Sequence, residues 1–232
     1  MRAFADSINF PCNQTHAPFP SAKKGNEEYN KEIFPMLVRA LEVSGIMGAK
    51  VCVIHPCNDY TAEENAELYK RLAPYARKAN VKIGVENMWN KMITDEHGLH
   101  ATPAACSHHD DFFAHMELLD KDVFCACVDI GHAEMMHAYD TGAAKIIEKL
   151  GDYMQSMHLH DVDLVHDNHA YPFNCWIDYK PIIQALRNIG YKGDITMEAT
   201  TPAKRVPVEL IPAAARYLAE IANYFKKEVE KN

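Results

Sequence analysis

The chain has 232 residues, of which 48% are hydrophobic and 24% are charged, as in an ordinary globular domain. Its formal net charge of −8 opposes a nucleic-acid-binding function, because such surfaces normally carry clustered lysine and arginine side chains. The seven cysteines form no C-x-x-C pair and are odd in number, which indicates reduced thiols rather than disulfides or a zinc–thiolate site. The sequence shows no signal-peptide pattern and no apolar run of membrane-spanning length, so we expect a cytoplasmic protein with no membrane partner.

Short apolar segments alternate with longer amphipathic segments along the chain. The apolar segments are rich in β-branched or small residues, which is typical of buried strands, and the amphipathic segments have helical periodicity. Thr61 precedes Glu64 by three residues, a capping-box pattern that predicts the start of a helix. In chain order the pattern predicts a helix over 26–48, a strand over 49–56, a helix over 61–80, strands over 81–88 and 123–132, a helix over 141–152, a strand over 153–161, a helix over 178–193, a strand over 193–200 and a helix over 207–232. We expect one α/β domain over residues 1–232, with a parallel sheet covered by helices.

Each predicted strand ends in side chains that can ligate a metal or transfer a proton. These side chains are His55, Glu86, Asp129 with His132, His158 to Asp161, and Glu198. In a (β/α)₈ barrel the carboxyl ends of all strands meet at one face, whereas an open doubly wound sheet binds ligands only near a switch point. Five such strands therefore favour a TIM barrel. No glycine-rich phosphate-binding motif follows a strand, so we expect no nucleotide cofactor.

Three carboxylates, those of Glu86, Asp129 and Glu198, emerge from apolar strands. One of them alone could be a structural residue hydrogen-bonded to a loop, but three at one face repel one another unless a cation holds them. We therefore expect a divalent metal. Carboxylates with one imidazole favour Mn²⁺, Mg²⁺ or Co²⁺, and additional histidines favour Zn²⁺. Asp167 and His169 can face one way in an extended loop, although the same pair is also typical of a solvated loop.

Motifs along nearly the whole chain resemble those of one family. They are HAPFPS (16–21), VIHP (53–56), GVENMW (84–89), VDIGHA (128–133), HLHDVD (158–163), HDNHAYPFNCWIDY (166–179) and GDITMEA (193–199). Together they resemble the xylose isomerase-like TIM-barrel superfamily of sugar and sugar-phosphate isomerases and epimerases, which also contains the endonuclease IV branch. The resemblance implies an incomplete TIM barrel, because MRAFADSINF (1–10) resembles the end of the family's first helix and the family's first strand is missing.

The resemblance also implies roles for individual residues. It implies a metal held by Glu86, Asp129, His158 and Glu198, and it selects His158 rather than His160 because the family's ligand histidine lies three residues before an acidic residue. Further positions match substrate contacts of epimerases or additional metal ligands of the endonuclease branch, namely His16, His55, His132, Asp167 and His169. Where relatives often carry Pro-x-x-Gly, this chain has Asn174 and Cys175, so the substrate loop differs.

Three functions are compatible with these residues. The first is a metal-dependent isomerase or epimerase of a small sugar or sugar phosphate, in which Glu86 and Glu198 exchange a proton through a metal-stabilised enediolate and Trp89 or Trp176 stacks on the sugar. A hydride shift between adjacent carbons is an alternative mechanism. The resemblance to the family also suggests a homodimer. The second is an endonuclease-type zinc phosphodiesterase, which the acidic net charge opposes. The third is a non-catalytic metal-binding barrel.

Overall fold

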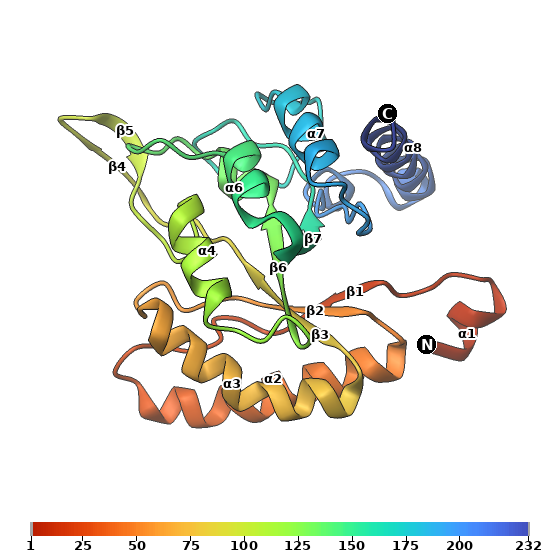
Figure 1. The fold of residues 1–232 in the computed structure, drawn as a ribbon. Helices are drawn as coiled ribbons and strands as arrows, with labels where there is room; N and C mark the ends of the chain where they lie inside the picture. The colour runs from red at the N-terminus through yellow and green to blue at the C-terminus, as the bar shows by residue number, and fades with distance from the viewer. Residues whose placement is uncertain (1, 232) are drawn as a thin grey trace.

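The computed structural model describes residues 2–231 and contains a curled sheet of five parallel strands. The strands are β1 (Gln14–His16), β2 (Val51–Ile54), β3 (Lys82–Glu86), β6 (Phe124–Asp129) and β7 (Met154–His158), hydrogen-bonded in that order. All neighbouring pairs are parallel. The sheet forms part of a barrel wall and leaves the barrel open (Figure 1). Four of the five predicted strands are confirmed, and β1 precedes them in the HAPFPS region.

Helices cover the outer face of the sheet and pack against one another in chain order (Figure 1). They are α2 (Glu27–Met47), α3 (Ala62–Ala79), α4 (His109–Glu117), α6 (Ala143–Leu150), α7 (Tyr179–Asn188) and α8 (Ile211–Val229), with α1 (Arg2–Ser7) at the start of the chain. The predicted capping box is confirmed, because the Glu64 amide donates to Thr61 Oγ1 and the Thr61 amide donates to Glu64 Oε2. Gly48 ends α2 with a φ of 77°, a left-handed conformation that glycine adopts without strain. None of the helices in the described part is long and apolar enough to cross a membrane.

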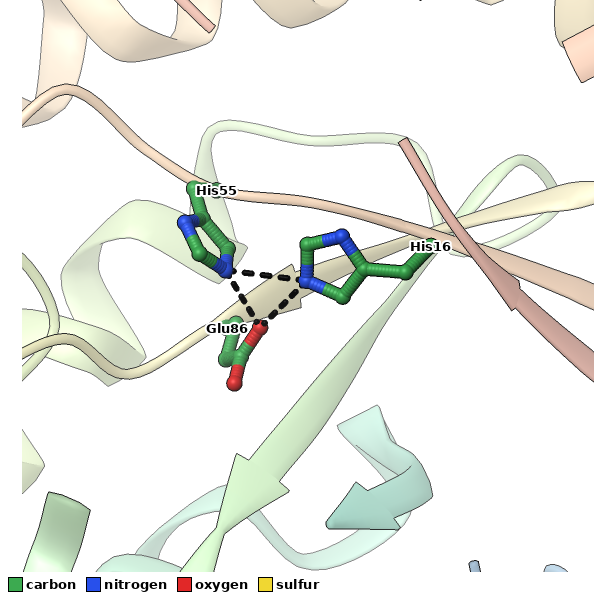
Figure 2. A group of neighbouring side chains, drawn as sticks. All are labelled: His16, His55 and Glu86. Carbon is green, nitrogen blue, oxygen red and sulfur yellow. Dashed lines mark hydrogen bonds and ion pairs between the residues drawn. The ribbon is translucent and has the colours of Figure 1, made fainter. Parts of the chain in front are cut away.

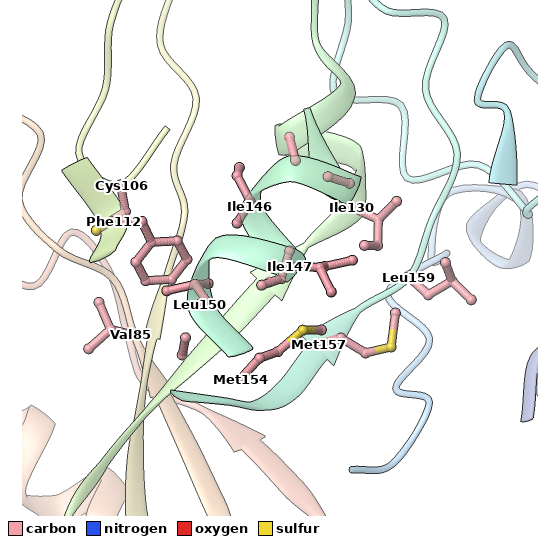
Figure 3. Packing of buried hydrophobic residues seen from close by; sticks show 14 of the residues in the cluster. Val85, Cys106, Phe112, Ile130, Ile146, Ile147, Leu150, Met154, Met157 and Leu159 are labelled. Carbon is pink, nitrogen blue, oxygen red and sulfur yellow. The ribbon is translucent and has the colours of Figure 1, made fainter. Parts of the chain in front are cut away.

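Alternate residues of each strand face two different layers. The outer-facing residues belong to the main core between the sheet and the helices, where Ile146, Ile147 and Leu150 of α6 pack above β6 and β7 (Figure 3). Val51 and Val53 of β2 form a separate inner cluster with Cys125 and Cys127 of β6. Because side chains alternate along a strand, the residues in register with this inner cluster face the barrel interior.

This alternation places the site. The last inward-facing residues of the strands are His16 of β1, Glu86 of β3, Asp129 of β6 and His158 of β7. A bulge in β7 sets the last of these, because Ala126 pairs with Met154 whereas Cys127 pairs with Ser156. The extra residue, Gln155, is exposed, and the bulge turns Ser156 and His158 inward.

Two predicted strand regions differ from the structure. The strand predicted over 193–200 is wrong, since only a single bridge joins Met197 to Leu159, through Leu159 N–Thr196 O at 2.8 Å and Glu198 N–Leu159 O at 3.0 Å. Within residues 2–231 no other strand pairs with this segment, so its pairing stops at one bridge, which is too short for a regular strand. The strand predicted over 123–132 ends at Asp129, because the Asp129 carboxylate accepts the His132 amide at 2.7 Å and begins the short helix α5 (Ile130–Glu134).

The structure also contains elements that the sequence pattern did not predict. These are the antiparallel hairpin β4 (Met92–Asp95) and β5 (Gly98–Ala101), helix α4, and three 3₁₀ turns at Gly151–Tyr153, Pro202–Lys204 and Val208–Leu210. The hairpin lies in the segment between β3 and α4, next to the carboxyl end of the sheet (Figure 1).

Candidate metal centre

Three carboxylates from different parts of the chain meet around one imidazole nitrogen. His158 Nδ1 lies 2.9 Å from Glu86 Oε1, 2.9 Å from Glu198 Oε2 and 3.6 Å from Asp129 Oδ2. Glu86, Asp129 and His158 are buried, and Glu198 is partly buried. We call these four residues the carboxylate group. The structure thus brings together the four positions that the sequence pattern proposed as first metal ligands, although the Glu198 segment is not a regular strand.

The donor set of the carboxylate group fits a divalent cation. Glu86 Oε2 and Glu198 Oε2 are buried oxygens that make no hydrogen bond of normal geometry among the described residues. Burial would raise the pKa of Glu86, but the neighbouring His158, His16 and His55 outweigh burial and hold that pKa well below its usual range. Burial likewise opposes ionisation of Asp129, yet His132 and His160 hold its pKa well below the usual value. Buried carboxylate oxygens that face one another in this way are the ligands that a hard divalent cation needs.

A second cluster consists of His16, His55 and Oε2 of Glu86 (Figure 2). The two Nε2 atoms lie 2.9 Å apart, and they lie 3.4 Å and 3.1 Å from Glu86 Oε2. His16 Nδ1 donates to the carbonyl of Ala17 at 2.7 Å, which leaves Nε2 as the nitrogen that faces the carboxylate. Only a shared proton or a cation makes so close an approach of two ring nitrogens favourable, and a cation would use both lone pairs.

A third cluster consists of His132, Asp167 and His169, which we call the histidine–aspartate group. Asp167 Oδ2 lies 3.6 Å from His132 Nε2 and 3.0 Å from His169 Nε2. His132 Nδ1 donates to the Asn87 carbonyl at 3.0 Å, and His169 Nδ1 donates to the Glu198 carbonyl at 2.9 Å. Both rings therefore present Nε2 to Asp167, the arrangement in which backbone carbonyls fix the tautomer of metal-binding histidines.

Carboxylates perturb the two imidazoles of this group in the absence of a metal. Burial lowers the pKa of His132, but Asp129 and Asp167 outweigh it and raise the value to about 10. The hydrogen bond to Asp167 raises the pKa of His169 to about 9 despite partial burial. A cation at this group would therefore have to displace protons from both rings.

One residue that supports the site was missed by the sequence interpretation. Asn87 is fully buried, its Nδ2 donates to Asp129 O at 2.9 Å, and its Oδ1 accepts the Asp129 amide at 2.7 Å. Its own carbonyl accepts His132 Nδ1, so it fixes ligands of two groups. An amide side chain directly after Glu86, at the end of a buried strand, is the signal that could have identified it.

Asp161 organises the loop that carries Asp167 and His169. This buried carboxylate accepts the amides of Val162 and Ile177 through Oδ1 and the amide of Cys175 through Oδ2. The bonds to Cys175 and Ile177 join the end of this loop to its start at Asp161.

The two tryptophans occupy different environments. Trp89 is partly buried and packs against the main core, and its carbonyl accepts Asn58 Nδ2 at 3.4 Å. Trp176 lies on the loop that Asp161 closes and is 75% exposed. Sugar stacking by Trp89 stays a prediction.

Known proteins share this architecture. A protein of Methanocaldococcus jannaschii of uncharacterized function is 26% identical over 197 residues, which cover 79% of this chain and 62% of the relative, so the chain spans about three fifths of that protein's length. The crystal structure of a D-tagatose 3-epimerase-like protein superposes with a TM-score of 0.68 at 21% identity, covering 96% of this chain and 82% of the other. D-psicose 3-epimerase from Clostridium cellulolyticum H10, solved with D-tagatose, gives a TM-score of 0.68 at 15% identity and covers 97% and 81%.

These likenesses confirm the predicted TIM-barrel fold, of which the five parallel strands form an incomplete example. The sequence profile of the xylose isomerase-like TIM barrel family matches residues 1–226. The chain therefore belongs to the xylose isomerase-like TIM barrel family.

Proposed function

We propose that this protein is a divalent-metal-dependent isomerase or epimerase of a small sugar or sugar phosphate. The observation that supports it best is the meeting of Glu86 and Glu198 at His158 Nδ1, 2.9 Å from each carboxylate. The names of the similar solved structures, a D-tagatose 3-epimerase-like protein and a D-psicose 3-epimerase, point to the same class of substrate.

The carboxylate group would hold the cation through Glu86, Asp129, His158 and Glu198. When bound there, a divalent cation supplies positive charge that polarises the carbonyl and hydroxyl oxygens of the sugar and stabilises an enediolate. Asp129 is fully buried and hydrogen-bonded through its backbone to Asn87, so it would serve as a fixed ligand rather than a mobile base.

Proton transfer is the task of the two glutamates. The imidazoles beside Glu86 hold its pKa well below the usual range, so it is ionised at neutral pH. As the carboxylate next to the bound sugar, it would accept a proton from the carbon next to the carbonyl. Glu198, which is partly exposed, would return a proton to the same carbon from the opposite face in an epimerase, or to the neighbouring carbon in an isomerase. His132 and His55 border this space and would position hydroxyl groups through their Nε2 atoms.

Deuterium wash-in tests this proposal. In D₂O with Mn²⁺ or Co²⁺, the wild-type protein is expected to exchange the proton next to the carbonyl of a ketose, and a chelator should abolish both exchange and turnover. Glu198→Gln and Glu86→Gln should lose the exchange, while Glu209→Gln, which removes an exposed carboxylate, should keep it. Undiminished exchange in Glu198→Gln would remove that residue from the acid–base role, and turnover that survives chelation would refute the metal dependence.

A zinc phosphodiesterase of the endonuclease type is the second candidate function. The specific observation in its favour is that the His16–His55 pair and the histidine–aspartate group flank the carboxylate group, as a multi-zinc cluster would require. The net charge of −8 weighs against a duplex substrate. An anomalous-scattering map separates the candidates: one octahedral metal supports the isomerase, whereas three zinc ions with cleavage of an abasic-site duplex would replace it. Metal binding without either activity would favour the non-catalytic barrel.

A further inference from the structure

His160 is a buried imidazole that contacts ligand side chains of two different groups. It has no exposed surface, and its Nε2 lies 3.0 Å from Asp129 Oδ1 and 3.2 Å from Oδ2. Because an ionised carboxylate only accepts hydrogen bonds, Nε2 is the donor. The face of the ring stacks on His169, with ring centroids 4.4 Å apart and planes inclined by 15°. Asp129 belongs to the carboxylate group and His169 to the histidine–aspartate group, so one ring joins both.

Neighbouring residues pack closely around the His160 ring. A Cβ atom added to Gly131 would lie 2.0 Å from His160 Cε1 and 2.4 Å from Nε2, so only glycine in the first turn of α5 leaves room for the imidazole. On its backbone, the His160 carbonyl accepts the Tyr179 hydroxyl at 3.1 Å. The imidazole is therefore packed between α5 and His169, and the backbone that carries it is bonded to Tyr179.

We propose that His160 is a positioning residue that holds Asp129 and His169 in the geometry needed to bind cations. This inference rests on the metal-dependent function proposed above, and it adds a cation at the histidine–aspartate group to the one at the carboxylate group. Nε2 lies within hydrogen-bond distance of both oxygens of Asp129 and so fixes the carboxylate plane, with Oδ2 also 3.6 Å from His158 Nδ1 in the carboxylate group. The stacked ring fixes the plane in which His169 directs its Nε2 at Asp167. Hydrogen bonds that orient a ligand typically change metal affinity by about 10–100-fold.

Two substitutions separate the two contacts. His160→Gln keeps an N–H donor for Asp129 but removes the ring that stacks on His169, and His160→Phe keeps the ring but removes the donor. Titration with Co²⁺, followed by calorimetry and by visible absorption, measures the affinity and the coordination of each bound ion. Asp167→Asn and Glu198→Gln serve as references that assign each binding event to the histidine–aspartate group or the carboxylate group.

The expected result is a crossed pattern. His160→Phe should weaken the event assigned to the carboxylate group by about 10–100-fold, and His160→Gln should leave that event unchanged while it weakens the event assigned to the histidine–aspartate group. If His160→Phe does not fold, as judged by urea unfolding, His160→Gln still decides, because a merely structural residue would not confine the loss to one event.

Other outcomes overturn the proposal in distinguishable ways. A wild-type protein that binds no Co²⁺ would overturn the metal-dependent function together with this inference. Binding of one Co²⁺ at the carboxylate group alone would leave that function standing and overturn the inference. Wild-type binding that neither variant changes, or that His160→Gln weakens equally at both groups, would overturn the inference alone.

Discussion

Asn87→Ala tests whether one buried amide holds the carboxyl ends of β3 and β6 together. The side chain donates to Asp129 O at 2.9 Å and accepts from Asp129 N at 2.7 Å, and both residues are fully buried. Removing it leaves one buried donor and one buried acceptor without partners, at about 1–3 kcal/mol each. We therefore expect the free energy of unfolding to fall by roughly 2–6 kcal/mol, and the melting temperature by roughly 5–20 °C for a chain of this length.

Two other asparagines make the same pair of bonds and serve as controls. Asn65 clamps the amide and carbonyl of Cys57 in the buried core, at 2.9 and 3.2 Å. Asn30 clamps those of Lys23 at 2.8 and 3.0 Å, where solvent can replace the lost partner. Asn65→Ala should destabilise the protein as Asn87→Ala does, and Asn30→Ala should change the free energy of unfolding by less than about 1 kcal/mol.

Metal affinity distinguishes Asn87→Ala from Asn65→Ala, the two variants that lose a buried asparagine. Only Asn87→Ala should also weaken metal binding, by about 10–100-fold, because the Asn87 side chain fixes the backbone of Asp129. Urea unfolding with chelator present gives the stabilities, and Co²⁺ titration gives the affinities. Equal stability of Asn87→Ala and Asn30→Ala would refute the role of the buried clamp, and equal Co²⁺ affinities of Asn87→Ala and Asn65→Ala would refute its link to the site.

Three further predictions concern pH, packing and thiol access. In the metal-free protein Asp167 raises the pKa of His169 to about 9. The ion pair therefore stabilises the fold fully below the unfolded pKa of about 6.5, and this stabilisation is lost as pH rises through 9. Between pH 6 and pH 10 the free energy of unfolding in urea should fall more in wild type than in Asp167→Asn, and equal decreases would contradict the prediction. Gly193→Ala should cost about 1–3 kcal/mol, because its Cβ would lie 2.5 Å from Gln155 O, and an unchanged melting temperature would show that the segment before Glu198 yields freely. Of the seven cysteines only Cys175 is exposed, so Ellman's reagent should give one fast phase that Cys175→Ser removes, and a fast phase that survives would place an accessible thiol elsewhere.

The sequence predicted the strands that form ladders of several residues and failed where the pairing is a single bridge. The runs around Val53, Val85 and Ala126 are apolar on both faces, as residues buried between helices and a barrel interior must be, so composition and period alone identify them. The segment around Met197 has a similar composition, yet it pairs through a single bridge, and the sequence does not encode how far a neighbouring strand extends along it. The β4–β5 hairpin escaped prediction because its strands have only four residues each and surround a charged turn before Gly98.

The candidate ligands could be named from the sequence, but their orientation could not. Residue type and position at strand ends pointed to Glu86, Asp129 and the stretch 158–161, and the family resemblance selected His158 within that stretch. Alternation along the strands places these three side chains on one face. The tautomers of His132 and His169 depend instead on the carbonyls of Asn87 and Glu198, which approach only when loops from distant parts of the chain pack together. Such contacts leave no periodic signal in the sequence.

Glu198 makes the two main groups mechanically dependent on one another. Its side chain lies 2.9 Å from His158 in the carboxylate group, and its carbonyl accepts His169 Nδ1 in the histidine–aspartate group. The backbone that carries it is joined to β7 only through the two hydrogen bonds of Leu159. A shift of this segment therefore moves a carboxylate ligand and releases an imidazole at the same time, whereas a shift of β1 moves only His16. Because a ladder of two hydrogen bonds opens more readily than a regular strand, the Glu198 side of the barrel is the one where the site can adjust to a bound sugar.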